Sequence, residues 1–584
     1  MRKKRVLLLA IAAVYVLSCF TGCKKQDPNA ASSDSLTGEV SSYEDVIASE
    51  DGESSAAVST VESGSSSPSS QGGTVSNTYV PRPDVKPATK KGKITVMSID
   101  RASSNYSMAK KSKILTEIEN QTNTEITFNL YPESNYETIK STRLAAGVNL
   151  PDIMFTGWSN DATPGYKGLF IDLKDLISKH APNITKVYNQ YPAVRKQNTT
   201  AEGNLFWVTT VDQTQYNGKE LPIVHSVSIR KDWLTKAGIA KVPETTEEFY
   251  QALKAFRDKD VNGNGLKDEI FAMWFNWQDA VQGWFGVPSD SFSIDQKTGK
   301  AKYVWDYDGA FEFISYMRRL YTEKLIDQDI FNISQDNILT KISQNKVAAI
   351  SYWTDCSAFE EQTGESSAEY VPMAPLKTET GSQGQFCYYN QGNSNANYAI
   401  TKSCKDPVAA IKFLDWFYSD YAQQLAVWGL EGVHCEYKNG KLQYTQSYIN
   451  SVIQGKDVAT IDDMFDWVPC LPAVRVKDWE ATYTAEHYPA KTLTKLEAQL
   501  KNATWKELVY SNPIGLATLD EAKKMSDYSG DMSTYAVETI TRFITGREKN
   551  FNRSTWDKFV QKLHSDYPLD ERLKIFQAQY DRLK

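Results

Sequence analysis

The chain has 584 residues, with 72 Asp and Glu against 65 Lys and Arg, and a formal net charge of −7. This acidic balance, without a stripe rich in Lys and Arg in the body of the chain, excludes a typical nucleic-acid-binding protein. The five His residues are scattered, and the motifs H-E-x-x-H, G-x-S-x-G and the P-loop do not occur, so the sequence offers no positive mark of catalysis.

Residues 1–22 have the layout of a secretory signal, with four basic residues, an apolar run and small residues. The run ends in Phe20-Thr21-Gly22-Cys23, which resembles the bacterial lipobox. We favour Cys23 over Cys19 as the lipidated residue, because Gly22 suits a peptidase and charge follows directly at Lys24. The alternative is an ordinary cleaved signal. The expected location is the extracellular face of the cell membrane, held by a lipid anchor.

A polar tether follows the signal. Residues 26–75 contain nine acidic and no basic side chains, many Ser and few large apolar residues. Such a stretch cannot bury enough surface to offset the cost of ordering it. We therefore predict a disordered tether over residues 23–90. The roughly 490 residues that remain are too many for one compact core and suit two or three lobes.

The body opens with alternating strand and helix patterns. Strands are predicted at Lys93 to Ile99, Glu125 to Tyr131 and Leu150 to Phe155, and helices at Lys110 to Gln121 and Tyr136 to Ala146. This order predicts parallel β-α-β units and an α/β fold, in which ligands collect at the carboxyl ends of the strands.

Further helix signals follow. Thr245 and Glu248 have the spacing of a capping box, which predicts a helix from about Thr246 to Arg257. Asp406-Pro407 begins another, with one apolar stripe formed by Ile411, Leu414, Tyr418, Tyr421 and Leu425. The last hundred residues have a largely helical pattern.

The sharpest chemical motif is DVNGNGLKDEI, which begins at Asp260. Oxygen donors stand at positions one, three, five and nine, and Gly265 at position six permits the sharp bend of an EF-hand calcium loop. Position twelve is Phe271, so two acids must replace the usual bidentate Glu. The expected ligands of a structural calcium ion are Asp260, Asn262, Asn264, the carbonyl of Leu266, Asp268 and Glu269. The alternative is a solvated Asn-Gly turn.

Four segments together resemble the extracellular solute-binding protein family 1 of ABC importers, in particular its large lipoprotein branch. They are LAAGVNLPDIMF (144–155), IRKDWLTKAGI (229–239) with the capped helix and calcium loop after it, WGLEGVHCEY (428–437) and ITRFITG (540–546). The resemblance implies a two-lobed, periplasmic-binding-protein-like α/β fold with ligand in a cleft, a hinge motion on binding, and a role as receptor for an oligosaccharide. It also implies ABC importer transmembrane subunits as partners; we expect a monomer.

The same resemblance suggests where the lobes divide. The chain is expected to leave the first lobe near Val224 to Ile229 and to return near Asn397 to Thr401. Lobe 1 would comprise residues 91–228 and about 398–470. Lobe 2 would comprise residues 229–397 and about 471–584.

A sugar presents apolar C–H faces and a rim of hydroxyls, so its site needs flat rings and planar polar groups in loops. The chain contains 14 Trp and 32 Tyr. Trp233 and Trp416 lie on helical patterns and are expected in the core. The ligand-binding candidates are Trp158, Asn160, Asp161, Trp274, Trp277, Trp284, Trp353, Asp355, Tyr388, Trp428 and Glu431.

Two other functions would share the composition. A secreted polysaccharide-acting enzyme would need two carboxylates across a cleft, and a cell-surface adhesin would hold glycans without an importer. We expect no enzyme. His434, the His of the Gly432-Val433-His434-Cys435 turn, is expected to make a local hydrogen bond rather than act as a base.

Overall fold

The computed structural model describes residues 79–84 and 91–100 and, with gaps, residues 112–583; the longer gaps are 390–395, 451–466, 483–492 and 498–507. The signal, Cys23 and most of the predicted tether lie outside the described residues. No helix in the described ranges is long and apolar enough to cross a membrane.

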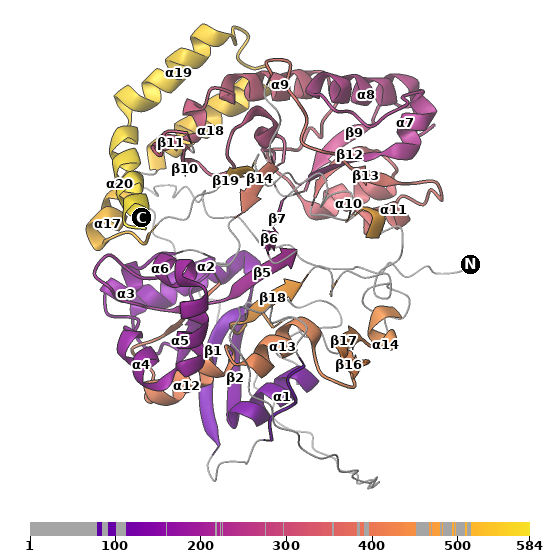
Figure 1. Ribbon diagram of the computed structural model, residues 1–584. Coiled ribbons are helices and arrows are strands. Elements are labelled where there is room, and N and C mark those ends of the chain that lie inside the picture. Colours follow the sequence, from indigo (N-terminus) through magenta and orange to yellow (C-terminus); the bar gives the residue numbers. More distant parts are fainter. Residues whose placement is uncertain are drawn as a thin grey trace, which may run out of the picture. The chain divides into compact units, whose positions relative to one another are not determined.

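The first sheet has the predicted β-α-β start (Figure 1). β1 (Gly92–Asp100) lies between β2 (Thr124–Pro132) and β3 (Ile153–Phe155), and both pairings are parallel. β15 (Asn397–Ile400) continues the sheet antiparallel to β3, and β4 (Val208–Thr209) closes it. The predicted β-α-β order is confirmed, and the segment that begins at Asn397 joins this sheet as β15.

Helices join and cover these strands. The two crossover helices are α1 (Lys113–Thr122), which Ser112 caps, and α2 (Glu133–Ala146). The other helices whose side chains enter the same core are α4 (Lys174–His180), α5 (Pro182–Gln190), α6 (Pro192–Gln197), α12 (Pro407–Trp416) and α13 (Asp420–Trp428).

Two predictions in this part were wrong in detail. The third strand begins at Ile153 rather than Leu150, because Pro151 has no N–H and the Asp152 carboxylate accepts the Thr95 N–H at 2.9 Å in place of a ladder bond. The apolar stripe after Asp406 belongs to two helices, not one. α12 ends at Trp416, and the hydroxyl of Ser419 accepts the Ala422 N–H to begin α13.

Residues 79–84 also differ from the sequence prediction, which placed them in the tether. They are docked on the folded body: Val80 N–H donates to the side chain of Gln424, and Arg82 pairs with Glu117. The Ser-rich composition of the tether gave no sign of this, because the attachment depends on a few polar contacts rather than on apolar burial.

A second sheet has the order β13-β8-β12-β9. β12 (Val347–Tyr352) is central, antiparallel to β8 (Ser226–Arg230) and parallel to β9 (Ile270–Met273); β13 (Tyr370–Pro372) pairs with β8. The helices around it are α7 (Lys231–Ala237), α8 (Thr246–Lys259), α9 (Ala310–Thr322), α10 (Gln335–Ser343) and α11 (Ser357–Gln362).

Local signals explain how this second unit begins. Thr245 and Glu248 form the predicted capping box, which satisfies two N–H groups at the start of α8. Trp233 is fully buried in a core distinct from the first and packs edge-on to Phe256, as its helical position predicted. That core also receives side chains from the C-terminal helices.

The C-terminal region is helical as predicted over its described part. The helices are α17 (Leu519–Asp527), α18 (Gly530–Ile544), α19 (Arg553–Asp566) and α20 (Leu569–Asp581), drawn in yellow in Figure 1.

The remaining strands form small sheets. Two of these are the hairpins of β10 (Phe292–Ile294) with β11 (Ala301–Tyr303) and of β16 (Cys435–Lys438) with β17 (Lys441–Tyr444); the other two combine β5 (Val211–Tyr216), β6 (Lys219–Leu221) and β18 (Val474–Asp478), and β7 (Ile223–Val224), β14 (Phe386–Tyr389) and β19 (Leu508–Tyr510).

Candidate functional site

The carboxyl end of β3 carries an aromatic ring and a pair of amides. Trp158, half-buried, stands edge-on to Phe155 with ring centroids 5.2 Å apart. Asn160 Oδ1 accepts a hydrogen bond from Asn397 Nδ2 at 2.9 Å. Thr156 N–H donates to the Asn397 carbonyl at 2.8 Å, which holds the loop after β3 against the start of β15. A ring for stacking and planar amides therefore occur together at one strand end.

The turn after β3 depends on a glycine. Gly157 has φ +92°, and a Cβ there would lie 2.5 Å from Glu137 Oε1 and 2.8 Å from Lys140 Nζ. Lys140 Nζ donates to the Thr156 carbonyl at 2.6 Å, so α2 helps to fix the loop. The Thr156 hydroxyl is buried and finds no hydrogen-bond partner in the described ranges. Asp161 is exposed and its carboxylate accepts the Thr163 N–H at 2.9 Å, which places it at the start of the short α3 (Thr163–Tyr166).

The second sheet also carries aromatics where its parallel strands end. Trp274 follows β9 directly and Tyr352 closes β12, with ring centroids 5.3 Å apart in an edge-on arrangement. Trp274 is buried beside Phe359. Within the part of the chain that the structure describes, the Trp274 indole N–H and the Ser351 hydroxyl are buried without hydrogen-bond partners. This strand end, like that of β3, therefore has polar groups that a ligand could pair with.

Two further candidate rings pack on the second core. Trp277 is half-buried and stacks on Phe313, with centroids 5.9 Å apart and planes within 1°. Trp284 lies in the short 3-10 helix Gln282–Phe285 and is 2% exposed, edge-on to Phe249. In this conformation both rings serve packing, and any contact with a ligand stays a prediction.

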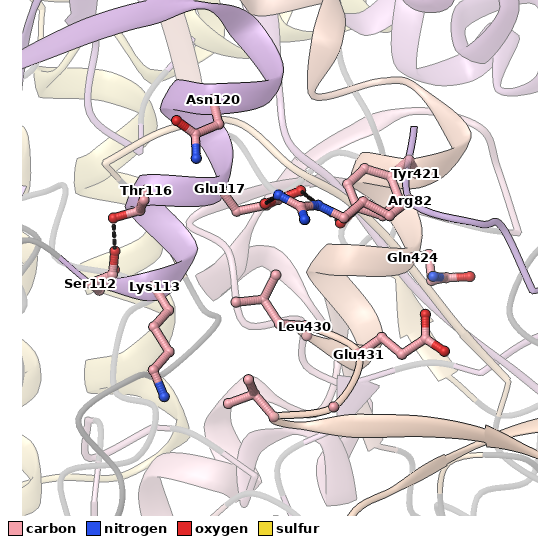
Figure 2. A pocket seen from close by; sticks show the side chains of 13 residues that line it. Arg82, Ser112, Lys113, Thr116, Glu117, Asn120, Tyr421, Gln424, Leu430 and Glu431 are labelled. Carbon is pink, nitrogen blue, oxygen red and sulfur yellow. Dashed lines mark hydrogen bonds and ion pairs between the residues drawn. The ribbon is translucent and has the colours of Figure 1, made fainter. Parts of the chain in front are cut away.

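The Gly-Leu-Glu-Gly turn (429–432) directly follows α13. A cavity of about 750 Å³ is bounded by α1, α13 and this turn (Figure 2). Glu431 lines the cavity and accepts the Tyr79 hydroxyl at 2.9 Å. Trp428, at the end of α13, is buried against Tyr444. His434 Nδ1 accepts the Leu430 N–H at 3.0 Å, which confirms its predicted local hydrogen-bonding role.

Three of the candidates cannot be placed in this way. Trp353 and Asp355 lie outside the described residues. Tyr388 belongs to β14, where its backbone pairs with Val224 and Tyr510, and its side chain is outside the described set. The structure therefore places Trp158 and Asn160 in one loop, keeps Trp274 on the other sheet, assigns Glu431 to the cavity and buries Trp428 in a core.

The predicted calcium loop closes on itself through hydrogen bonds. Asp260 ends α8 with φ +50°, and its carboxylate accepts N–H groups from Asn264 at 3.1 Å and Gly265 at 2.8 Å. The side-chain amides of Asn262 and Asn264 donate to Asp268 at 3.1 and 3.0 Å. Leu266 is 58% exposed, and because its side chain has no oxygen it can offer a cation only its carbonyl.

Glu269 is the feature of this loop that a turn alone does not explain. It is 1% exposed, and its Oε1 accepts the Asn262 N–H at 3.3 Å, whereas Oε2 is buried and has no hydrogen-bond partner among the described residues. Burial, and then the nearby Asp260 and Asp268 carboxylates, raise the pKa of Glu269. For Asp268, burial acts to raise the pKa, but hydrogen bonds from Asn264, Asn262 and Lys346 hold it below its usual value.

These oxygens fit a cation only with rearrangement. Within the described ranges no three His, Cys, Asp or Glu side chains converge as a ready metal cage. The acids of the loop instead face amide N–H groups and Lys346. Rotation of the Asn262 and Asn264 amides would turn oxygens inward, and a cation would satisfy the orphaned Glu269 oxygen.

Asn397 and the buried hydroxyls Thr156 and Ser351 are site candidates that the sequence did not indicate. The one feature of the sequence that could have indicated them is their position, because each lies at or near the end of a strand. Small polar residues there are too common to single out without the tertiary contact.

Comparison with known proteins agrees with this architecture. Residues 102–424 match the family model for bacterial extracellular solute-binding proteins. The fructooligosaccharide ABC transporter substrate-binding protein FusA of Streptococcus pneumoniae is 23% identical over 497 residues, covering 80% of this chain and 86% of FusA. Lipoprotein LipO of Bacillus subtilis is 26% identical over 349 residues, covering 56% of this chain and 65% of LipO.

The fold is shared with solved structures. That of a FusA EF-hand mutant in complex with fructo-nystose superposes with a TM-score of 0.66 at 20% identity, over 84% of this chain and 99% of FusA. The two sheets with separate cores are the two lobes of a substrate-binding protein. The chain belongs to the bacterial extracellular solute-binding protein family.

Proposed function

We propose that this protein is the ligand-capturing receptor of an ABC importer and that its ligand is an oligosaccharide. The observation that carries the proposal is the family match over residues 102–424. FusA, which aligns with most of the chain, is named for fructooligosaccharide transport. The receptor would present captured solute to transmembrane subunits, and it would perform no chemistry on it.

The strand ends give the proposal a physical site. Trp158 supplies a ring that could stack on a C–H face of a sugar, and the amides of Asn160 and Asn397 stand beside it to pair with hydroxyls. Trp274 and the orphaned Ser351 hydroxyl would supply similar groups from the second lobe. Closure of the lobes by a hinge would bring both sets onto one ligand.

A structural calcium ion in the loop after α8 is part of the proposal. Asp260, Asn262, Asn264, the Leu266 carbonyl, Asp268 and Glu269 would hold it. The orphaned, buried Oε2 of Glu269 supports this role, because a bound cation would remove the cost of leaving it unpaired. The name of one similar solved structure, a FusA EF-hand mutant, refers to an EF-hand in that relative, which supports the proposal.

The location is proposed from the sequence. Lipidation at Cys23 would hold a monomeric receptor at the outer face of the membrane, and the name of the related lipoprotein LipO is in keeping with that. Lobe 1 would comprise residues 91–228 and about 398–470, and lobe 2 residues 229–397 and about 471–584. Val474 and Val476 of β18 pack in the first core, which favours moving the segment around this strand from lobe 2 to lobe 1.

A glycan screen tests the proposal. The mature chain is mixed with fructooligosaccharides, uronate oligomers and other oligosaccharides, and the melting temperature and the sugars are measured. A receptor gains about 2.7 kcal/mol of stability at a ligand concentration of 100 Kd, and the sugars stay intact. Shortened sugars would instead indicate an enzyme, and the absence of any stabilising solute would contradict a receptor for oligosaccharides.

A further inference from the structure

Residues 79–84, which we call the strap, join the predicted tether to the folded body. They precede β1 in sequence, yet their contacts are with α1, α13 and the segment around Glu431. Figure 2 shows Arg82 reaching Glu117 of α1, with Gln424 of α13 nearby. The strap therefore contacts elements other than β1, the strand that follows it in the sequence.

Gln424 recognises the backbone of the strap. Its Oε1 accepts the Val80 N–H at 2.6 Å, and its Nε2 donates to the Val80 carbonyl at 3.0 Å. One side-chain amide thus satisfies both backbone groups of one residue, as a neighbouring strand would. Gln424 is 8% exposed, so these bonds are sheltered from water.

Arg82 neutralises a buried acid. The Glu117 side chain is 6% exposed, and the Arg82 guanidinium meets both of its oxygens, with Nε to Oε1 at 2.8 Å. Tyr421 and Gln121 also donate to Glu117 Oε1, each at 2.9 Å. A carboxylate buried to this degree is costly without a cation, so the strap supplies what the fold around α1 requires.

Both ends of the strap have additional contacts. Tyr79 stacks on Tyr437 of β16, with centroids 4.3 Å apart, and donates its hydroxyl to Glu431. The Pro83 carbonyl accepts Gln121 Nε2 at 3.1 Å. Tyr79, Val80, Arg82 and Pro83 of the strap thus all contact the folded body. A linker that only connects two parts of the chain would not need these contacts.

From these contacts we infer that the strap is a clasp that fixes the point at which the tether leaves the protein. The described chain first meets the folded body at Tyr79, beside the β16–β17 hairpin, rather than at Gly92, where β1 begins. A pulling force on the tether would then act first on α1, α13 and the β16–β17 hairpin, which the strap contacts, and not directly on β1. That the tether is anchored in a membrane rests on the proposed function, whereas the contacts of the clasp do not depend on it.

The test uses the mature chain without its lipid, and neither ligand nor membrane, so that it succeeds or fails independently of the receptor assignment. Hydrogen exchange at the Val80 amide is the first measurement, and chymotryptic cleavage after Tyr79 is the second. In the clasped protein we expect both to be at least about tenfold slower than in an isolated peptide of the same sequence.

Two variants release the clasp in different ways. Gln424→Ala removes both hydrogen bonds to Val80. Arg82→Ala removes the ion-pair partner of Glu117, and because the Arg82 side chain is 60% exposed, its removal leaves no cavity in a core. The matched control is Gln423→Ala on the same helix, because the side-chain amide of Gln423 donates to the Tyr418 carbonyl at 2.9 Å rather than to the strap.

We expect exchange and cleavage to rise about tenfold in both strap variants and to stay within about twofold of wild type in the control. The inference is overturned if the Val80 amide of the wild type exchanges at the rate of the isolated peptide. It is equally overturned if the control accelerates as much as Gln424→Ala, since general loosening of α13 would then explain the effect.

Discussion

The side chains of Asn160 and Asn397 are hydrogen-bonded at 2.9 Å although 237 residues separate them in the chain. Asn397 is fully buried at the start of β15, and Asn160 lies in the loop after β3. The bond joins the loop that precedes much of the first lobe to the strand by which the chain returns to it, and it places two amides beside Trp158.

This bond predicts coupling between the two residues. Asn397→Ala leaves a cavity and removes the donor to Asn160, and we expect it to lower the free energy of unfolding by about 1–3 kcal/mol. Asn160→Ala, which removes a less buried partner, should cost less. In a double-mutant cycle measured by urea unfolding, the two changes should fall short of additivity by about 0.5–1.5 kcal/mol. Strict additivity would show that the contact contributes nothing to stability.

Trp158 should matter for ligand more than for stability. Trp158→Ala is expected to weaken oligosaccharide binding by about tenfold or more, as loss of a stacking anchor does. Trp416→Ala is the matched control. Like Trp158, Trp416 is half-buried against the first core and stands edge-on to a Phe, with centroids 5.1 Å apart.

Calorimetry with the best glycan from the screen gives the affinity of each variant, and thermal melting gives its stability. Both variants should lose similar stability, and only Trp158→Ala should lose affinity. Equal affinity losses would mean that the strand end of β3 is not where the ligand binds, although another site could still serve the receptor.

The order of strands and helices could be predicted where the signal was local. The β-α-β start and the capping box of α8 follow from periodicity and from residues three positions apart. The break between α12 and α13 was missed, because the apolar stripe runs through it and only Ser419 marks the new start. The strap was missed for a different reason: its partners Glu117 and Gln424 lie far along the chain.

The site was less predictable than the fold. A Trp after a strand can enter a core or face a ligand, and the sequence does not distinguish the two; Trp284 and Trp428 proved almost fully buried, whereas Trp158 is half-exposed. The contact of Asn160 with Asn397 depends on the antiparallel return of β15, which no local pattern specifies. A motif whose residues all lie in one loop, such as that around Asp260, was easier to predict from the sequence.

The calcium proposal predicts that a chelator lowers the melting temperature of the wild type and that Glu269→Gln abolishes this response. A neutral amide would bind the cation less well, and it would relieve the repulsion from Asp260 and Asp268 that acts on Glu269 in the absence of metal. Asp258→Asn is the control, since this acid precedes the loop and pairs with Lys254 and Arg257. A chelator effect that persists unchanged in Glu269→Gln would place the ion elsewhere.

His564 predicts a pH dependence of stability that is independent of any ligand. Its ring nitrogens lie 2.7 Å from Asp570 and 3.0 Å from Asp306, so it joins α19 to α20 and to the residues before α9. Burial alone would lower its pKa, but hydrogen bonds and charge from Asp306 and Asp570 raise it above 6.5.

Because the folded protein holds this proton more tightly than the unfolded chain, the stabilisation is fully present below the unfolded pKa of about 6.5 and is lost as pH rises through the higher folded pKa. His564→Gln lacks the titrating group. The melting temperature of the wild type should therefore exceed that of the variant most at about pH 6, and the difference should shrink toward pH 9. If the difference in melting temperature between wild type and variant stays constant across this pH range, the ring stays neutral between its two carboxylates.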